Sequence, residues 1–239
     1  ASSTDTVGTF ARTVEDAAAV IDVMAGRDPF DGTTIERQPE GYLDLPADVK
    51  GKKVGIIKEY MSDGLDPGVK ARIEEAAAKL KAAGADVQEV SLPSIKLALA
   101  VYYIIVPAEV SSNLSRHDGQ RYPFSYQDAK DLDESYMKSR GNGFGKEAKR
   151  RIMIGTYVLS SGYYDAYYRK AQIVRTKLIN EFNEVFKQVD FLIGPVAPTP
   201  AFKIGENDND PLKMYLVDIM TVAANLVGVP SISVPAGLS

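Results

Sequence analysis

The chain has 239 residues, of which 45% are apolar and 25% are charged, and these proportions exclude a disordered or fibrous protein. Its net charge of −4 gives no electrostatic reason for the whole surface to bind nucleic acid. With no cysteine and only one histidine, His117, the sequence excludes disulfides, thiolate zinc sites and a cysteine nucleophile.

The sequence shows neither a membrane segment nor a secretion signal. No apolar run approaches the roughly 18 residues of a membrane-spanning helix, and the N-terminus lacks a basic region followed by an apolar one. We therefore expect a cytoplasmic protein without a membrane partner. Because the chain opens on Ala1 and closes just after an apolar run, we also expect 1–239 to be a single partial domain truncated at both ends.

The first third of the chain alternates strands and helices. A helix should begin after Thr13, which has capping-box spacing to Asp16, and end before Gly26. A surface loop then covers 27–50. The next elements are a strand over 53–58, a helix introduced by Asp66 and Pro67 that ends at Gly84, and a strand over 86–92. This order predicts an α/β fold with a mixed central β-sheet, at least partly parallel, flanked by helices.

The rest of the chain is predicted to be mainly helical. Apolar residues over 95–116 indicate two helical pieces broken near Pro107, because proline removes a helical hydrogen bond. The polar, aromatic stretch 117–142 is interpreted as a long irregular excursion. Two long helices should then meet at Gly162. The expected elements are helices over 146–161 and 163–189, a strand over 190–195, a loop over 198–210, a helix over 211–226 and a last strand over 231–234.

Several residues could carry chemistry, and each also has a structural interpretation. His117 beside Asp118 could act as a base, but no nucleophile is placed for it, so we favour a loop residue. Ser2 and Ser3 lack a base and a glycine-rich turn, so we interpret them as a turn or strand end. The tyrosines at helical spacing are interpreted as packing at a helix interface: Tyr157, Tyr163, Tyr164, Tyr167 and Tyr168.

Three charged residues could bind a ligand of opposite charge. Arg150 and Arg151 follow Lys149, which is typical of a solvated face, although an arginine can also grip a carboxylate in a bidentate fork. Asp218 is a lone charge among apolar residues, so it lies either on an exposed helix face or against a cation. The residues alone favour the solvated face for the two arginines and leave both interpretations of Asp218 open.

Four stretches of the chain resemble the amidase-signature family. The first and last resemble the broad family, whereas the tyrosine-rich third resembles more specifically the glutaminase subunits of tRNA-dependent amidotransferases. The resemblance covers essentially the whole chain. The stretches are 5–18, 108–116, 149–168 and 194–200.

This resemblance implies a Ser-cisSer-Lys mechanism, in which a lysine and a bridging serine activate a nucleophilic serine. In the family these three residues lie upstream of a Ser-x-Asp-x-x-Gly stretch, which here is Ser3 to Gly8. We therefore expect no catalytic residue in this chain and no activity from the chain alone.

The resemblance also maps the family's glutamine pocket onto Tyr102, Arg151 and Asp218. It implies that Arg151 binds the α-carboxylate, that Asp218 binds the α-ammonium group, and that Tyr102 donates a hydroxyl hydrogen bond. Arg150 and Tyr103 remain alternatives at the neighbouring positions.

The implied function is a glutaminase subunit that releases ammonia to convert Glu-tRNA(Gln) to Gln-tRNA(Gln). Its implied partners are glutamine, the B and C subunits of the amidotransferase, and Glu-tRNA(Gln) mainly through the B subunit. No cofactor is expected in this chain, and ATP and Mg are expected on the partner protein. The alternatives are a stand-alone amidase that hydrolyses small amides and a catalytically silent interaction fragment.

Overall fold

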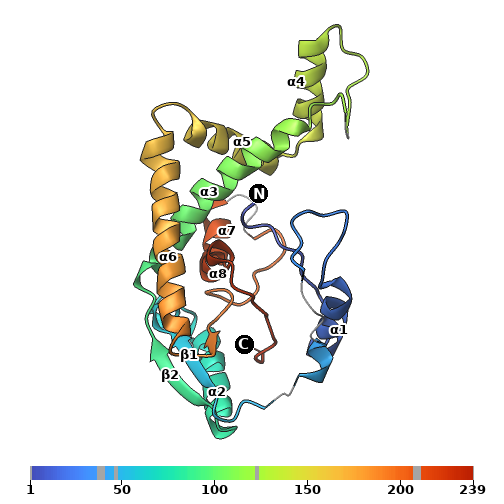
Figure 1. Cartoon of the computed structure of the whole chain (residues 1–239). Helices are drawn as coiled ribbons and strands as arrows, with labels where there is room; N and C mark the ends of the chain where they lie inside the picture. The colour runs from blue at the N-terminus through green and yellow to red at the C-terminus, as the bar shows by residue number, and fades with distance from the viewer. Residues whose placement is uncertain (1, 37–40, 46–47, 122–123, 207–210, 239) are drawn as a thin grey trace.

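A small parallel sheet lies at one end of the molecule, with helices packed around it (Figure 1). The computed structural model describes residues 2–36, 41–45, 48–121, 124–206 and 211–238. The strands are β1 (Lys53–Ile57), β2 (Asp86–Val90) and β3 (Phe191–Ile193), in the sheet order β2-β1-β3. Both strand pairs are parallel, with Val54 facing Val87 on one side and Phe191 on the other. The predicted α/β class is confirmed.

Helix α2 (Pro67–Ala82) connects β1 to β2, as predicted from the strand, helix and strand order. It begins at Asp66, whose carboxylate accepts hydrogen bonds from the backbone N–H groups of Gly68 at 2.8 Å and Val69 at 3.2 Å. These bonds satisfy two of the donors that a helix start leaves free. Pro67 occupies the first turn, where its missing N–H costs nothing.

The helix α3 (Ala98–Asn113) is continuous, so the predicted break near Pro107 is wrong. Pro107 lies inside the helix and its side chain is fully buried. Gly155 of α5 (Lys146–Leu159) packs so closely against Pro107 that an added Cβ would be 1.9 Å from the Pro107 carbonyl oxygen. Tertiary packing therefore keeps helical a segment that local preference would break.

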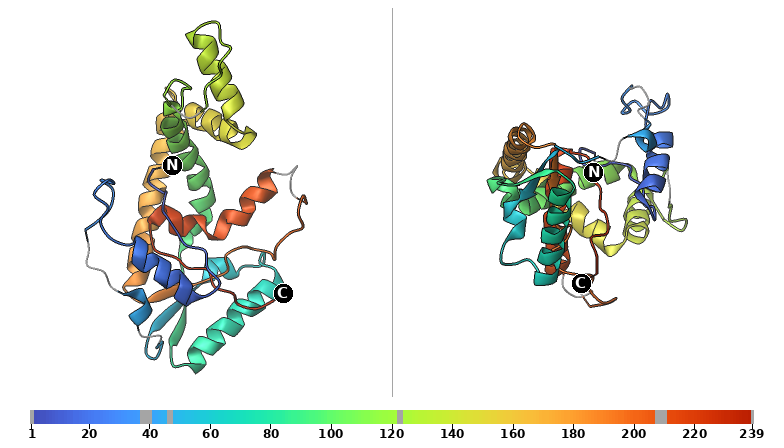
Figure 2. Two further views of the ribbon diagram at one scale, coloured as in Figure 1. Left: turned by 90° about the vertical axis from the view of Figure 1, so that its right-hand side faces the viewer. Right: turned by 90° about the horizontal axis from the view of Figure 1, so that it is seen from below.

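The region predicted to be an irregular excursion contains a helix, α4 (Leu132–Gly143). Asp131 caps it, with its carboxylate accepting a hydrogen bond from the Glu134 N–H at 2.8 Å. The helix has almost no buried side chain, with Ser139 the exception, because it projects away from the other elements (Figures 1 and 2). Without a core-facing stripe it leaves no helical period in the sequence, and only its cap could have revealed it.

Two long helices follow α4 and meet at Gly162, as predicted. Gly162 has a φ of +83°, a conformation that favours glycine, and it separates α5 from the next helical stretch. That stretch opens with a π-helical turn over Tyr164–Arg169 and continues as α6 (Lys170–Phe186). The predicted helix over 211–226 is divided into α7 (Pro211–Val217), the 3₁₀ turn η6 (Asp218–Met220) and α8 (Val222–Val227).

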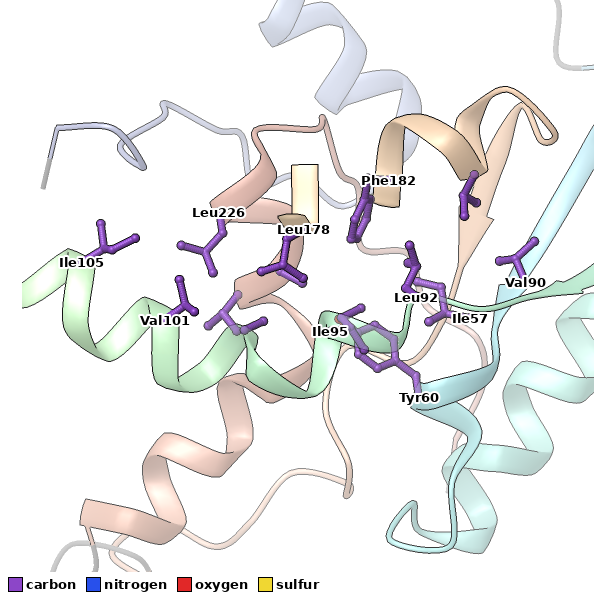
Figure 3. Packing of buried hydrophobic residues seen from close by; sticks show 14 of the residues in the cluster. Ile57, Tyr60, Val90, Leu92, Ile95, Val101, Ile105, Leu178, Phe182 and Leu226 are labelled. Carbon is purple, nitrogen blue, oxygen red and sulfur yellow. The ribbon is translucent and has the colours of Figure 1, made fainter. Parts of the chain in front are cut away.

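One core joins the sheet to the helices (Figure 3). Helix α3 runs through it and contacts α5, α6 and α8. The fully buried side chains Leu92, Ile105, Leu178 and Leu226 come from four separate segments of the chain. Short 3₁₀ turns lead into and out of these segments: η2 (Lys58–Met61), η3 (Pro93–Leu97) and η4 (Leu114–Arg116).

The helical stretch Pro93–Arg116 is long and apolar enough to cross a membrane by length and composition alone. In this structure 44% of its most apolar part is buried inside the protein. Ile95, Val101 and Ile105 of the same stretch belong to the core. We therefore interpret it as the central core helix.

Helix α1 (Val14–Met24) and the 3₁₀ turn η1 (Tyr42–Asp44) lie apart from this core. Helix α1 begins with the predicted cap, in which the Thr13 hydroxyl accepts a hydrogen bond from the Asp16 N–H at 3.1 Å. None of its residues is buried, and its neighbour is η1. Figure 1 shows α1 and η1 to one side of the helices around the sheet.

The C-terminal residues do not form the strand predicted over 231–234. Within the described residues this stretch has no regular secondary structure and pairs with no strand, and Ile232 and Val234 are 66% and 54% exposed. An apolar alternation predicts a strand only where a neighbouring strand can accept its hydrogen bonds. Residues 207–210 of the predicted loop over 198–210, and 37–40 and 46–47 of the one over 27–50, lie outside the described residues.

The contact between Gly155 and Pro107 predicts a large effect of a single methyl group. Replacing Gly155 with Ala should lower the free energy of unfolding by about 1–3 kcal/mol or more, because the two helices must move apart. Urea denaturation of the full-length protein measures this change. The matched control is Gly141→Ala in α4, where an added Cβ meets no atom within 4 Å, and this substitution should stabilise by about 0.5–1 kcal/mol. Equal effects at the two positions would contradict the prediction.

Candidate functional site

A cavity of about 400 Å³ opens between α3, η6, α8 and the N-terminal residues of the chain. Helix α3 supplies Tyr102 and Val106, which are one helical turn apart and so share a face. The turn η6 supplies Asp218. The lining consists of Thr4, Asp5, Tyr102, Val106, Asp218, Thr221, Val222 and Asn225.

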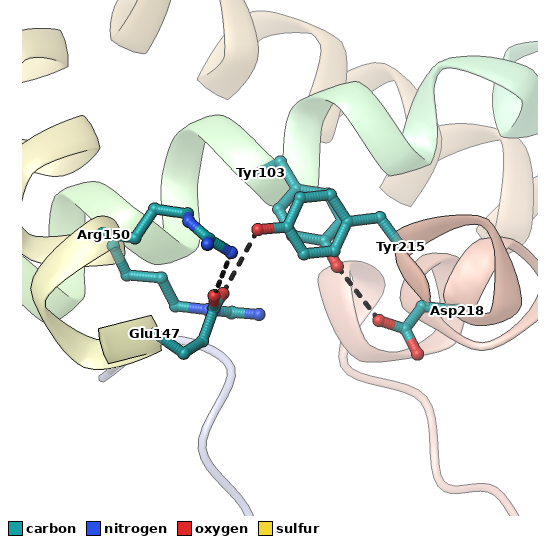
Figure 4. A network of polar contacts seen from close by, with 6 residues as sticks. Tyr103, Glu147, Arg150, Tyr215 and Asp218 are labelled. Atoms are coloured by element: carbon teal, nitrogen blue, oxygen red, sulfur yellow. Dashed lines mark hydrogen bonds and ion pairs between the residues drawn. The ribbon is translucent and has the colours of Figure 1, made fainter. Parts of the chain in front are cut away.

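Asp218 is half-buried and is oriented by a tyrosine (Figure 4). The Tyr103 hydroxyl donates a hydrogen bond to Asp218 Oδ2 at 3.1 Å. Burial raises the pKa of Tyr103, and the negative charge of Asp218 raises it further, so this hydroxyl stays a donor at neutral pH. The structure thus gives Asp218 a neutral hydroxyl partner at a cavity wall, which matches neither the exposed face nor the direct cation contact that the sequence left open.

Arg151 lies beside the cavity and does not line it. Its Nε donates to Glu147 Oε1 at 3.0 Å, and its guanidinium is 5.5 Å from the centre of the Tyr103 ring. Burial opposes its charge, but Glu147 and Tyr102 outweigh this and hold the pKa of Arg151 above its ordinary value. The side chain is 24% exposed, compared with 46% for Arg150, so the sequence interpretation of a solvated face fits Arg150 better than Arg151.

Glu147, in the first turn of α5, has three polar partners, of which Tyr215 lies on α7 (Figure 4). It binds Arg150 Nη1 at 2.6 Å and Arg151 Nε at 3.0 Å, and it accepts a hydrogen bond from the Tyr215 hydroxyl at 3.2 Å. Tyr215 in turn packs on Tyr103, with ring centres 4.3 Å apart. Tyr103 therefore contacts a cation through its ring, under Arg151, and an anion through its hydroxyl, which binds Asp218.

This arrangement can bind a ligand that carries both charges. A carboxylate would pair with Arg151 and an ammonium group with Asp218, while Tyr102 offers a hydroxyl at the cavity wall. The structure therefore brings Tyr102 and Asp218 to one cavity, with Arg151 next to it. Among the described residues no group of three or more His, Asp or Glu side chains could hold a metal ion.

His117 lies at a separate place in the fold. It lines a smaller cavity of about 160 Å³ with Phe124, Arg140 and Phe144, close to α4. Arg140 Nη1 donates a hydrogen bond to the His117 carbonyl at 2.9 Å, and this bond attaches the backbone of the loop to α4. The favoured interpretation of His117 as a loop residue agrees with this position.

The tyrosine stripe lies on the surface of the helix pair. Tyr157 and Tyr163 have ring centres 4.2 Å apart, and Tyr163 and Tyr167 have theirs 6.1 Å apart. Hydrogen bonding with Tyr163 raises the pKa of Tyr157 to about 12. These three residues are 40–49% exposed. They pack on one another at the junction of α5 and the π-helical turn, and none of them lines the cavity.

The sequence interpretation missed several residues around the cavity. Glu147 precedes Arg151 by one helical turn, a spacing that favours an ion pair and could have revealed it. Asn225 follows Asp218 by seven residues, a spacing that would place both on one side of the single helix predicted over 211–226. Thr4 and Asp5 reach the cavity only through the tertiary fold and leave no local signal.

The sequence profile of the family described as Amidase matches residues 1–239. The chain belongs to the amidase family. The chain is 55% identical over 240 residues to the A subunit of the glutamyl-tRNA(Gln) amidotransferase of Koribacter versatilis, covering 100% of the chain and 50% of that protein. The corresponding protein of Carboxydothermus hydrogenoformans is 54% identical, covering 99% of the chain and 49% of that protein. The amidase chain thus spans about half the length of the curated relatives it matches.

Solved structures of amidases have the same fold. The A subunit of the glutamyl-tRNA(Gln) amidotransferase of Thermotoga maritima superposes with a TM-score of 0.70 at 40% identity, covering 95% of this chain and 45% of that one. A bacterial aryl acylamidase of the amidase-signature family superposes with a TM-score of 0.68 at 23% identity, covering 97% of this chain and 46% of that one. The second likeness concerns the fold alone. The predicted family resemblance is confirmed.

The bond between Tyr103 and Asp218 predicts a measurable effect on stability. Replacing Tyr103 with Phe keeps the ring next to Arg151 and removes the donor to Asp218. We expect the free energy of unfolding to fall by about 1 kcal/mol, because water in the cavity replaces part of the lost bond. Urea denaturation of the full-length protein tests this, with the exposed Tyr164→Phe as control. An equal change in both variants would show that the Tyr103 hydroxyl contributes nothing.

Proposed function

We propose that this chain is the glutamine-binding half of the glutaminase subunit of a tRNA-dependent amidotransferase. In this proposal Arg151 binds the α-carboxylate of glutamine, Asp218 binds its α-ammonium group, and Tyr102 donates a hydrogen bond to it. The nucleophilic serine and its activating serine and lysine belong to the other half of the protein. The chain by itself then binds substrate without hydrolysing it.

The observation that carries this proposal is the placement of opposite charges around one cavity. Asp218 lines the cavity and Arg151 lies beside it, and Tyr103 contacts both side chains. A free amino acid carries a carboxylate and an ammonium group on one carbon, so it needs two such partners close together. A simple aliphatic amide carries neither charge and would leave both partners unused.

The geometry also favours one residue of each alternative pair. Tyr102 lines the cavity, whereas the Tyr103 hydroxyl is engaged with Asp218. Arg151 interacts with Tyr102 and is less exposed than Arg150, which points toward Tyr215 and Glu147. These contacts support Tyr102 and Arg151 as the residues that meet glutamine.

The similarity to relatives named as the A subunit of glutamyl-tRNA(Gln) amidotransferase supports the reaction assigned to the whole protein. In this proposal the ammonia passes to the B subunit, which uses ATP and Mg to amidate Glu-tRNA(Gln), and the C subunit completes the complex. The acidic net charge of −4 agrees with tRNA binding mainly to the B subunit. The location we propose for this complex is the cytoplasm.

Replacing Arg151 with Ala in the full-length protein, assembled with its partner subunits, tests the proposal. Loss of a buried charged contact to a ligand costs about 2–5 kcal/mol, so the KM for glutamine should rise by roughly 30-fold or more. Steady-state ammonia release measures both KM and kcat. Arg169→Ala is the matched control, because Arg169 forms the same type of ion pair at one helical turn but is 69% exposed.

An unchanged KM for glutamine in Arg151→Ala would contradict the assignment of this residue. A larger effect of Arg150→Ala would transfer the carboxylate site to that neighbour. Faster turnover of simple aliphatic amides than of glutamine by the wild-type protein would favour the stand-alone amidase. Ammonia release by the 239-residue chain alone would contradict the location of the catalytic residues in the other half.

A further inference from the structure

The N-terminal residues that form one wall of the cavity are held by a glutamate on α3. Glu109 Oε2 accepts hydrogen bonds from the backbone N–H groups of Ser2 at 2.6 Å and Ser3 at 2.9 Å. The Ser3 hydroxyl donates to the other oxygen of the same carboxylate. Glu109 is half-buried, and although burial opposes its charge, the bonds from Ser3 and Ser2 hold its pKa below the ordinary value. The carboxylate therefore stays ionised and accepts all three bonds.

An arginine on α6 holds the same serine from the other side. Arg175 Nη1 donates to the Ser3 hydroxyl oxygen at 2.6 Å, and its Nη2 donates to the Ser3 carbonyl at 3.1 Å. Its Nε donates to the carbonyl of Leu226, at the end of α8, at 2.7 Å. One guanidinium thus fixes Ser3 against both α6 and α8, in a geometry that a lysine cannot reproduce.

These contacts bear directly on the cavity. Asn225 Nδ2 donates to the Thr4 carbonyl at 2.9 Å, and Asn225, Thr4 and Asp5 all line the cavity. Ser3 precedes the two lining residues of the N-terminal segment, so any shift of Ser3 is passed on to them. The neighbouring segment from 6 to 12 is exposed apart from an intermediate Thr9, so its own packing does little to hold this wall in place.

We propose that Glu109 and Arg175 are positioning residues that fix Ser3, so that Thr4 and Asp5 form the wall of the substrate cavity opposite Tyr102 and Asp218. This inference rests on the proposed function of the cavity in glutamine binding. Neither residue touches the substrate. Their effect is to keep the binding cavity in one shape before substrate arrives, which lowers the cost of ordering the wall on binding.

We call the contacts of Glu109 and Arg175 with Ser3 the clamp, and the chain contains a matched comparison for it. Glu59 accepts a hydrogen bond from the Ser91 hydroxyl at 2.5 Å and from the Leu92 N–H at 2.9 Å, which is the same pattern of a serine hydroxyl and a backbone N–H. Its pKa is also lowered, with burial opposing and the bonds from Leu92 and Ser91 prevailing. Glu59 contacts the end of β2 in the core region and does not line the cavity. A purely structural role predicts similar behaviour for Glu59 and Glu109.

The experiment compares Glu109→Gln, Arg175→Lys and Glu59→Gln in the full-length protein with its partner subunits. For the two clamp variants we expect the KM for glutamine to rise at least 5-fold with a smaller change in kcat, because the cavity wall is less ordered. Amide hydrogen exchange of residues 2–8 should become at least 10-fold faster. Glu59→Gln should leave both quantities unchanged, and Glu109→Asp, which keeps the carboxylate, should restore part of the loss in KM.

The two readouts separate this inference from the proposed function. Hydrogen exchange needs no glutamine, so unchanged exchange of residues 2–8 in both clamp variants overturns the clamp whatever the substrate is. Faster exchange with an unchanged KM overturns the positioning role. A fall in kcat alone, equal in Glu59→Gln and Glu109→Gln, would assign both glutamates to stability. A wild-type protein that does not use glutamine would overturn the proposed function, while the exchange result would still decide the clamp.

Discussion

The close contact between α3 and α5 sets the position of most other parts of this structure. Gly155 has no side chain, so the backbone of α5 reaches the backbone of α3 at Pro107. Along α3 this contact lies between the tyrosines of the candidate site, Tyr102 and Tyr103, and Glu109, which binds the N-terminal residues. Because α3 also contacts α6 and α8, one packing interaction fixes the helix from which both the cavity and the clamp take their geometry.

The residues around the cavity are held both by contacts between neighbours in the sequence and by contacts between distant segments of the chain. Glu147 and Arg151 belong to one helix and pair because residues one turn apart face each other. Asp218 meets Tyr103 across 115 residues of sequence, and Glu109 meets Ser2 across 107. The short-range pair forms wherever α5 is helical. The long-range contacts exist only when the core has assembled, so the geometry of the cavity depends on the same packing as the fold.

Much apolar surface is exposed among the described residues of this chain. Helix α1 buries none of its residues, and the C-terminal residues Ile232 and Val234 are more than half exposed. The relatives that the chain matches are about twice its length, and their amidase fold includes a further half.

The sequence by itself determined several local elements and the family. The cap at Asp66 and the break at Gly162 follow from side-chain and backbone preferences that act over a few residues. The parallel pairing of β1 and β2 follows from the order of strand, helix and strand along the chain. The family resemblance supplied Tyr102, Arg151 and Asp218, whose local patterns alone favoured other interpretations or none. Helix α4 was missed because a helix without a buried face leaves no period in the sequence.

Only the tertiary structure decided that α3 passes Pro107 unbroken, that residues 231–234 stay unpaired within the described part of the chain, and that Thr4 and Asp5 reach the cavity. Each of these outcomes depends on what another segment offers: a glycine at the crossing point, a free strand edge, or a carboxylate and a guanidinium around Ser3. Such partners lie far away along the chain. A local sequence pattern records preferences of neighbouring residues and therefore carries no information about them.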